Sequence, residues 1–472
     1  MPDSKSQILK DLLGKEEITL TDDQDDALHV FLDFLKSKKD YCAYLLTGSA
    51  GTGKTFLINL FSRILKKSGY NVILLAPTGR AAKVISKRTK RLAYTIHHHI
   101  YSPIENSAGE IYFDLKENKD SGNVVYIVDE ASMIGNHRDS NTQNNLLIDL
   151  LSYIYTDDQS RKLIIVGDPV QLPPVGHNDS PALDPDLLKN RGSLKVFHAH
   201  LSEVRRQLVD SGVLENAVLI RDAYQSGKTE KLLIDPNRDV QMLESPWEAL
   251  EAYMGYFVAG DQDRVVFLTY SNFRSTRVNQ AIRKQLFDTE DILLPTDLVM
   301  VVKNNYAWGD PKKFPFIANG EMGTVRHVYP ETREKRYGLE FMDVEIEFQD
   351  TRGEPFPVEC KVVLNLLQDK QPQIPSDVMY RVVQERRQEY LGLSKNKAGE
   401  MMRTDPYVNA LQIKYGYSIT GHKSQGGQWE NVIIGFEPDY GNDMQAYVRW
   451  AYTVFTRAEK RVFLLNCPFV KD

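Results

Sequence analysis

Short apolar runs alternate with helical patterns along the N-terminal half of the chain. Runs of this kind, bounded by turn residues, predict buried strands. The predicted strands are 44–46, 71–76, 124–128 and 161–166. Apolar side chains at the spacing of an amphipathic helix come before or after these strands. Strands that alternate with helices in this way predict an α/β domain with a parallel sheet flanked by helices.

The turn after the first predicted strand is rich in glycine and ends in Lys-Thr. It reads G-x-x-x-x-G-K-T and precedes a helical pattern at residues 56–61. Such a turn gathers backbone N–H groups around phosphates, and the dipole of the following helix adds to the attraction. Lys54 would reach the β- and γ-phosphates of ATP, and the Thr55 hydroxyl would hold Mg²⁺. The predicted ATP-binding residues of the turn are Gly48, Ser49, Ala50, Gly51, Thr52, Gly53, Lys54 and Thr55.

Two acidic residues close the third predicted strand. Asp129 and Glu130 directly follow the apolar run 124–128. Adjacent carboxylates at the end of a buried strand are costly unless they serve a site. Beside a phosphate-binding turn, Asp129 suits a Mg²⁺ contact through water, and Glu130 suits the base that orients an attacking water. The next strand ends in a polar turn, where Gln171 is placed to sense a γ-phosphate.

Gln24 lies in the first turn of the predicted N-terminal helix, after Thr21 or Asp22 as N-cap. Its amide carries both donors and an acceptor, which suits the edge of adenine. A solvated glutamine in a first helical turn is the other interpretation, and sequence spacing does not separate the two. Gln24 is therefore a predicted ATP contact with that alternative open.

Charge and cysteine content narrow the class of protein. The 472 residues carry a net charge of −6, which does not indicate nucleic-acid binding but leaves room for a local basic groove. The three cysteines are widely spaced, which favours a reducing compartment over a disulfide framework. The charged N-terminus lacks the apolar core of a signal peptide, and no apolar run is long enough to span a membrane. We expect a cytoplasmic protein without a membrane partner.

The C-terminal half begins a second series of strand and helix patterns at residues 264–272. Residues 343–348 alternate strictly between acidic and apolar side chains, which predicts a half-exposed strand. A charged helix is predicted at 378–391. In the first half, alternation within about 100–122 predicts a small surface hairpin.

An ordered series of motifs runs from about residue 20 to 465. The series resembles the superfamily 1 helicases, most closely the RecD/Dda-like group of 5′→3′ polarity, superfamily 1B. Chance assembly of the motifs in this order is negligible. The matching stretches are 48–55, 76–78, 95–97, 129–132, 167–171, 203–207, 420–426 and 452–458.

The resemblance implies two RecA-like P-loop domains with ATP between them. The second domain would carry an inserted SH3-like β-barrel. The implied division is an N-terminal arm at 1–20, a first RecA-like ATP-binding domain at 21–204 with a hairpin insert at about 100–122, a second RecA-like domain at 205–295 plus 411–472, and an SH3-like β insert with a helix at 296–410.

The resemblance also assigns residues to roles. Arg206 and Arg457 match the family's arginines that reach the γ-phosphate, where charge develops during phosphoryl transfer. Because both come from one chain, a monomer can complete the site. Other residues match loops that line the family's single-strand groove, where phosphate contacts and stacking hold the strand. They are Pro77, Thr78, His97, Thr420 and His422.

We therefore expect a DNA helicase or translocase that uses ATP and Mg²⁺, moves 5′→3′ on single-stranded DNA and opens tailed duplexes in DNA repair, recombination or replication. The alternative is an ATP-gated clamp on single-stranded DNA, or a RecD-type subunit of a recombination or exonuclease complex, without unwinding of its own. The intact Asp129, Glu130 and Arg457 favour the motor. Tyr112 and Phe113 of the hairpin are the candidates for a strand-separating wedge.

Overall fold

The computed structural model describes most of the chain. The described residues are 20–105, 111–137, 145–204, 211–309, 316–350, 353–437 and 443–470. They belong to two compact units, each described here by itself. The first unit comprises Met1–Pro77, Val84–Ile104 and Tyr112–Asp210, and the second comprises Thr78–Lys83, Glu105–Ile111 and Ser211–Asp472.

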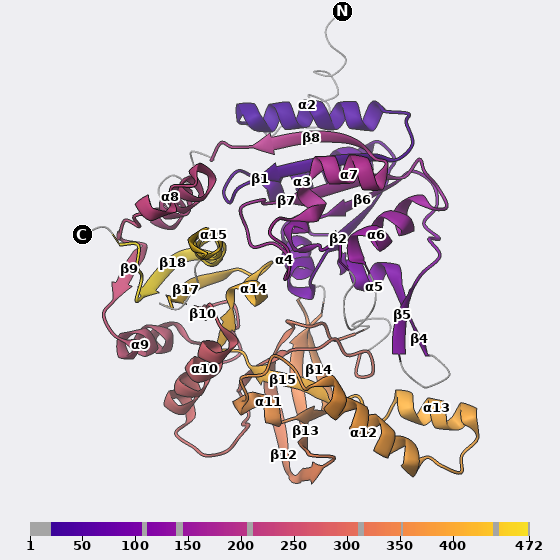
Figure 1. Cartoon of the computed structure of the whole chain (residues 1–472), viewed down its shortest axis with the longest axis vertical. Helices are drawn as coiled ribbons and strands as arrows, with labels where there is room; N and C mark the ends of the chain where they lie inside the picture. The colour runs from indigo at the N-terminus through magenta and orange to yellow at the C-terminus, as the bar shows by residue number, and fades with distance from the viewer. Residues whose placement is uncertain are drawn as a thin grey trace, which may run out of the picture. The chain divides into compact units, whose positions relative to one another are not determined.

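A six-stranded sheet forms the centre of the first unit, with strand order β3-β2-β6-β7-β1-β8 (Figure 1). All of its pairings are parallel. Its strands are β1 (Cys42–Gly48), β2 (Asn71–Ala76), β3 (Ala93–Thr95), β6 (Val124–Val128), β7 (Lys162–Gly167) and β8 (Lys195–Leu201). The side chains of β1, β6 and β7 are buried throughout, as expected of central strands covered on both faces. The four predicted strands are confirmed.

Helices join the strands of the first unit. They are α2 (Asp22–Lys36), α3 (Lys54–Lys67), α4 (Gly79–Thr89), α5 (Ile96–Ile100), α6 (Leu146–Tyr155) and α7 (Pro185–Gly192), with 3-10 turns η1 (Ala131–Met133) and η2 (Pro181–Leu183). Thr21 is the N-cap of α2, and with Gln24 it forms a capping box, so that the open choice between Thr21 and Asp22 is settled. Helix α2 lies along β8 (Figure 1).

The predicted surface hairpin is confirmed as the pair β4 (Tyr101–Glu105) and β5 (Ile111–Leu115). Phe113 packs against the core of the first unit. The side chain of Tyr112 lies outside the described residues.

The second unit contains a five-stranded sheet, again with parallel pairings throughout. In sheet order its strands are β16 (Ser418–Thr420), β10 (Val265–Thr269), β17 (Trp429–Gly435), β18 (Ala458–Leu465) and β9 (Val240–Leu243). Its helices are α8 (Gly212–Ser226), α9 (Pro246–Tyr256), α10 (Asn272–Phe287), α14 (Gly421–Ser424) and α15 (Met444–Phe455), with the 3-10 turn η4 (Thr229–Lys231).

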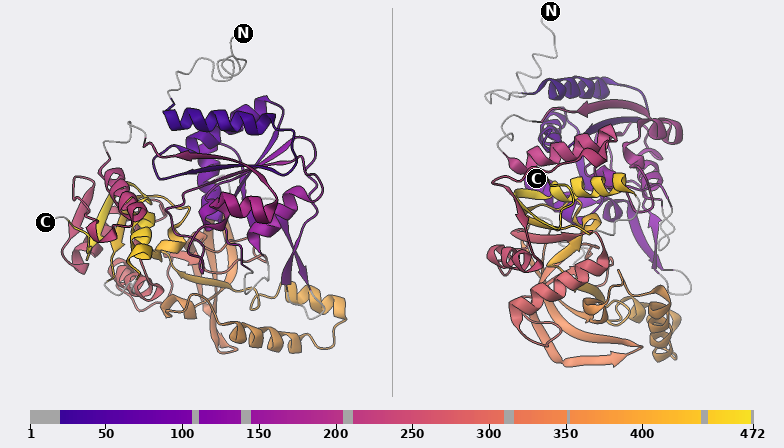
Figure 2. Two further views of the ribbon diagram at one scale, coloured as in Figure 1. Left: turned by 45° about the horizontal axis from the view of Figure 1, so that its top comes forward. Right: turned by 60° about the vertical axis from the view of Figure 1, so that its left-hand side comes forward.

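A closed barrel is inserted into this unit between β10 and β16. Its strands are β11 (Leu298–Val301), β12 (Met322–Arg336), β13 (Leu339–Gln349), β14 (Pro355–Val363) and β15 (Leu411–Tyr415). Figure 2 shows β12 and β13 as its long strands. Buried and half-exposed side chains alternate along most of β13, which confirms the predicted half-exposed strand.

Three helices connect β14 to β15. They are α11 (Asn365–Gln368), α12 (Ser376–Glu389) and α13 (Lys395–Arg403). Helix α12 confirms the predicted charged helix. The two parallel sheets and the small barrel confirm the predicted fold class. None of the helices in the described part of the chain has the length and apolar character that a bilayer crossing requires.

Candidate functional site

The glycine-rich turn connects β1 to α3. Gly51 and Gly53 have φ angles of 79° and 94°, in the left-handed region that glycine adopts without a steric penalty. The Thr52 hydroxyl donates a hydrogen bond to the Ser49 carbonyl over 2.8 Å and closes the turn on itself. Because α3 begins at Lys54, its first N–H groups and its dipole favour an anion at this turn.

The ammonium group of Lys54 is held against the turn. It donates to the carbonyl oxygens of Gly48 at 2.7 Å and Ser49 at 2.9 Å. Its Nζ lies 4.0 Å from Oδ2 of the fully buried Asp168. A cation is therefore already oriented where a bound phosphate needs one.

The amide of Gln24 faces the same turn from α2. Its Nε2 donates to the Thr52 carbonyl at 2.8 Å, and its Oε1 accepts from the Thr21 N–H at 3.4 Å. The side chain is 0% exposed, so the interpretation as a solvated glutamine is wrong. In this arrangement Gln24 braces the turn, and a contact with adenine would require the amide to turn outward.

The acidic pair stands at the end of β6. Asp129 Oδ1 accepts from the Glu130 N–H at 2.9 Å. Glu130 has φ 52°, a left-handed conformation that costs a non-glycine residue free energy and is often found at functional sites. Burial, and next the charge of Glu130, raise the pKa of Asp129 to about 7, while the positive charges of Lys54 and Arg88 act in the opposite direction. This carboxylate would gain from a further cation.

Arg88 of α4 is a site residue that the sequence analysis missed. Its Nη1 donates to the Thr55 hydroxyl over 3.4 Å. Arg88, Thr55 and Asp129 thus share one region of the first unit, which comes from α4, α3 and the end of β6. One hydroxyl and one buried carboxylate are the hard oxygen ligands that Mg²⁺ accepts, so the donor set fits the predicted metal.

The turn after β7 lies between the glycine-rich turn and the acidic pair, because β7 lies between β1 and β6 in the sheet. Asp168 Oδ1 accepts from the Val170 N–H at 2.9 Å, and the Gln171 N–H donates to the Asp168 carbonyl at 3.3 Å. The Gln171 side chain is buried. Tertiary structure thus gathers Lys54, Gln171 and the acidic pair at the carboxyl edge of one sheet, where open α/β sheets bind ligands.

Thr47, directly before the glycine-rich turn, has histidine partners that the sequence analysis also missed. Its hydroxyl lies 3.0 Å from His198 Nε2 and 2.9 Å from His200 Nδ1. Both histidines belong to β8, which pairs with β1. The two histidines at alternate positions of this strand are the sequence feature from which these contacts could have been predicted.

Two of the predicted DNA contacts lie together in the first unit. Pro77 follows β2 and His97 lies just after β3, and these strands pair in register at Ala76 and Thr95. The His97 ring is 5.6 Å from the Tyr101 ring. Thr78 belongs to the second unit, and its hydroxyl accepts from the Ala81 N–H at 3.2 Å at the start of α4.

The other two lie at the end of β16 in the second unit. Thr420 is the last residue of β16 and the N-cap of α14, and its side chain is buried. The side chain of His422, in α14, is exposed. A strand end followed by exposed polar side chains is a position from which a ligand can be contacted.

Arg457 is folded into the second unit. Its guanidinium donates to the carbonyls of Thr453 at 3.0 Å and Gly427 at 3.3 Å and to the Thr456 hydroxyl at 3.0 Å. The side chain is only 3% exposed. These bonds orient a cation, and some of them must break before it contacts a ligand. Arg206 lies outside the described residues.

Two parts of the chain match known protein families. Residues 35–177 match the AAA domain, and residues 415–465 match the UvrD-like helicase C-terminal domain. The ATP-dependent DNA helicase dda of Enterobacteria phage T4 is 24% identical over 60% of this chain and 61% of its own length. These matches support a superfamily 1B helicase of the RecD/Dda type. The predicted resemblance is confirmed.

Two relatives match more of the chain. An uncharacterized protein of Acanthamoeba polyphaga mimivirus is 24% identical over 91% of this chain and 96% of its own length. An uncharacterized protein of Methanocaldococcus jannaschii is 23% identical over 89% of this chain but only 36% of its own length. The chain thus spans about a third of the length of one relative and nearly all of another.

Proposed function

We propose that this protein is an ATP-dependent DNA helicase or translocase that moves 5′→3′ on single-stranded DNA. The observation that carries the proposal is the cluster at the carboxyl edge of the first sheet: a glycine-rich turn with an oriented Lys54 after β1, and the acidic pair after β6, with only β7 between these two strands. The second parallel sheet, with the helicase C-terminal match at 415–465, makes the motor the better candidate than other ATPases.

In the proposed hydrolysis, ATP binds with its phosphates over the glycine-rich turn. Lys54 leaves its carbonyl partners for the β- and γ-phosphates, and Glu130 accepts the proton of the attacking water. Gln171 lies in the turn after the strand between them and orients that water or senses the γ-phosphate. Mg²⁺, held by Thr55 and through water by Asp129, would neutralise charge that develops on the phosphates.

Arg457 and Arg206 are proposed to place positive charge on the γ-phosphate in the transition state. Such a contact is worth about 10³- to 10⁵-fold in rate. The three hydrogen bonds of Arg457 would make its release part of the cycle. With both arginines in the same chain, we propose a monomer.

On the DNA side, we propose that Pro77, Thr78, His97, Thr420 and His422 line the strand track. The predicted bounds, 21–204 for the first motor domain and 205–295 plus 411–472 for the second, are part of this proposal. An alternating grip by the two domains would convert hydrolysis into steps along the strand.

The experiment that tests the proposal compares two duplexes, one with a 5′ single-stranded tail and one with a 3′ tail, in the presence of ATP and Mg²⁺. We expect unwinding of the 5′-tailed duplex alone, and none by Lys54→Ala. Unwinding of the 3′-tailed duplex instead would contradict the polarity.

A second candidate, the ATP-gated clamp or RecD-type subunit, is favoured by the packing of Phe113 against the core, because this removes one of the two wedge candidates from an exposed position. Strand-stimulated ATP hydrolysis without opening of either duplex would support it over the helicase.

A further inference from the structure

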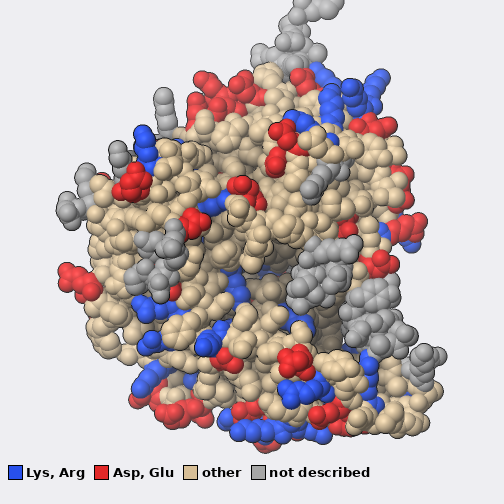
Figure 3. All heavy atoms as spheres, viewed as in Figure 1, with Lys and Arg blue, Asp and Glu red and all other residues tan. Residues whose placement is uncertain are grey.

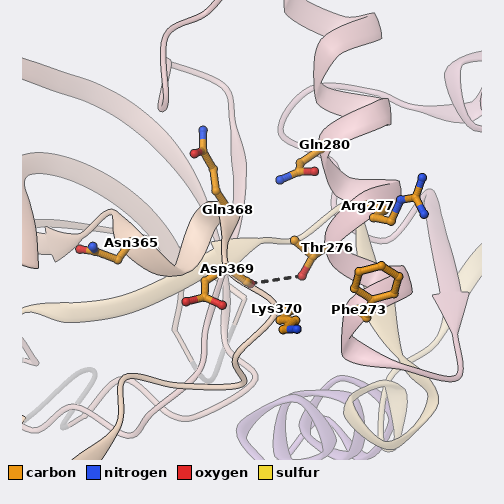
Figure 4. A pocket seen from close by; sticks show the side chains of 8 residues that line it. All are labelled: Phe273, Thr276, Arg277, Gln280, Asn365, Gln368, Asp369 and Lys370. Atoms are coloured by element: carbon orange, nitrogen blue, oxygen red, sulfur yellow. Dashed lines mark hydrogen bonds between the residues drawn. The ribbon is translucent and has the colours of Figure 1, made fainter. Parts of the chain in front are cut away.

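A cavity of about 490 Å³ lies on the second unit between α10 and the segment that contains α11 (Figure 4). Neither the sequence motifs nor the comparisons assign it a role. Its lining residues are Phe273, Thr276, Arg277, Gln280, Asn365, Gln368, Asp369 and Lys370. They come from two segments far apart in the sequence, so the cavity is a product of tertiary structure.

One wall of the cavity is a stripe along α10. Phe273, Arg277 and Gln280 are separated by four and three residues, so they share one face of the helix, and all three side chains are exposed. Phe273 is 53% exposed, which is unusual for a phenylalanine, and the Arg277 guanidinium lies 5.7 Å from its ring centre. An exposed aromatic ring beside a cation is the arrangement on which nucleobases stack.

The other wall consists of α11 and the residues that follow it. The Thr276 hydroxyl donates to the Asp369 carbonyl over 3.4 Å and fastens the two walls together (Figure 4). Lys370 places a second positive charge at the cavity. Asn365 Oδ1 accepts from the Glu340 N–H at 2.8 Å and is thereby held in place. This wall is therefore fixed to both α10 and the barrel.

The one carboxylate in the lining, Asp369, is tied into the protein. Its Oδ1 accepts from the Gln371 N–H at 3.0 Å. Its carbonyl accepts from Lys414 Nζ at 2.7 Å, and this lysine also offsets the charge of the Asp369 carboxylate. With Arg277 and Lys370 beside this one carboxylate, the lining carries more positive than negative charge.

We propose that this cavity holds one nucleotide of the single-stranded nucleic acid on which the protein acts, with its base stacked on Phe273 and its phosphates at Arg277 and Lys370. This inference rests on the proposed function and extends the strand track onto α10. The amides of Gln280 and Gln368 offer donors and acceptors to the edge of the base. An acidic peptide would use the cations but leave the exposed ring and the two amides without a purpose.

The helix α10, which forms one wall of the cavity, packs with another face against the strand that precedes the predicted strand-contact loop. The Ser275 hydroxyl and the Asn279 amide of α10 both donate to the Ser418 carbonyl, each over 2.8 Å, and β16 then leads to Thr420 and His422. The cavity and the predicted strand-contact loop therefore belong to the same unit and are linked through α10.

Two lysines of the second unit, the buried Lys414 and the half-buried Lys423, have lowered pKa values. Burial lowers the pKa of Lys414 to about 8, and burial together with the charge of Lys414 lowers that of Lys423 to about 8. Cations that are destabilised by burial gain from a nearby anion. On the face drawn in Figure 3, acidic and basic side chains are interspersed over much of the surface, so this face is not broadly basic.

The test is a binding assay by fluorescence anisotropy with an oligothymidylate that covers the whole track and a set of copies in which one nucleotide at a time is abasic. For the wild type, we expect one position at which loss of the base weakens binding about 5- to 150-fold, the range for loss of one stacked base. Phe273→Ala should bind the intact strand more weakly by the same factor and show no further loss at that position, whereas Phe273→Trp should restore both.

Charge is tested by the salt dependence of the same binding. Arg277→Ala and Lys370→Ala should each reduce the slope of log K against log salt by about 0.7, the value for one phosphate contact on a single strand. Lys284→Ala is the matched control, because this exposed lysine lies in the last turn of α10 and does not line the cavity. Thermal unfolding of each variant checks that it is folded.

The outcomes separate the two levels of the argument. If the wild type binds the strand but Phe273→Ala binds equally well and keeps the same abasic profile, the cavity is not a nucleotide site and the proposed function stands. If Lys284→Ala lowers the slope as much as the two lining variants, the effect is general charge and the inference is wrong. If the wild type binds no single strand, both the proposed function and this inference are overturned.

Discussion

In each of the two parallel sheets, one strand leads through a tight turn into a helix. The groups that lie at the start of that helix differ between the two sheets. After β1, the turn contains two left-handed glycines and a lysine whose ammonium group is bound to backbone carbonyls. After β10, the carboxylate of Glu437 fills the corresponding place. Its Oε1 accepts from the N–H groups of Tyr270 at 3.1 Å and Ser271 at 2.9 Å, and its Oε2 accepts from the Ser271 hydroxyl at 2.8 Å.

The difference shows how similar strand–turn–helix units provide a candidate nucleotide site in one unit and a hydrogen-bonded connection between two strand ends in the other. A helix N-terminus favours an anion in both cases. The second unit supplies that anion from its own chain, at the end of β17, whereas the first unit supplies a cation and glycines that let an external phosphate approach. We therefore predict one ATP bound per chain, at the first unit.

Among the substitutions that test this comparison, Lys54→Ala is expected to have the largest effect. Without the oriented cation, the first turn loses what distinguishes it, and we expect ATP hydrolysis to fall to the level of the enzyme-free background. A coupled phosphate-release assay measures this. Lys66→Ala, an exposed change in the last turn of the same helix, is the control and should hydrolyse at the wild-type rate. Substantial turnover by Lys54→Ala would refute the assigned site.

The next largest effect concerns Arg457, the cation that the second unit is proposed to supply to the γ-phosphate of ATP. Arg457→Ala should lower kcat about 10³- to 10⁵-fold with a much smaller change in nucleotide affinity. Since its guanidinium also bonds Thr453 and Gly427, thermal unfolding must be measured in parallel. A folded variant with wild-type kcat would assign Arg457 a purely structural role.

Glu130→Gln sharpens the description of the first site. The neutral amide keeps the shape of the side chain but cannot take up a proton from water, so kcat should fall about 10²- to 10⁴-fold. Nucleotide binding, measured by titration calorimetry, should persist. Loss of binding would mean that the strained Glu130 backbone holds the site together and that the carboxylate is not the base.

The smallest effect is expected for Glu437 of the second unit, which accepts hydrogen bonds from Tyr270 and Ser271. Glu437→Ala removes the acceptor of two backbone N–H groups at the start of α10, and we expect the free energy of unfolding to fall by about 1–3 kcal/mol. Glu215→Ala, an exposed acid in the first turn of α8, is the matched control and should cost less than about 1 kcal/mol. Calorimetry should still find one ATP per chain. A second bound nucleotide in Glu437→Ala would show that the carboxylate blocks a site.

The sequence by itself determined the features that short stretches encode. The glycine-rich turn, the buried strands, the acids that end β6 and the half-exposed strand β13 all follow from local patterns, because backbone conformation and burial periodicity are set by neighbouring residues. The order of the motifs was also enough to establish the family resemblance. At the start of the first helix, two points were left open: whether Thr21 or Asp22 is the N-cap, and whether Gln24 contacts ATP or solvent.

Tertiary structure decided which side chains meet. The Gln24 amide reaches the Thr52 carbonyl, Arg88 reaches Thr55, and Glu437 closes the start of α10, each across a long stretch of sequence. The cavity between α10 and α11 arises in the same way. Such contacts depend on the order of strands in a sheet and on which helix covers which face. Local hydrophobic patterns do not specify the order of the strands, because any arrangement that buries the same apolar faces is equally compatible with them.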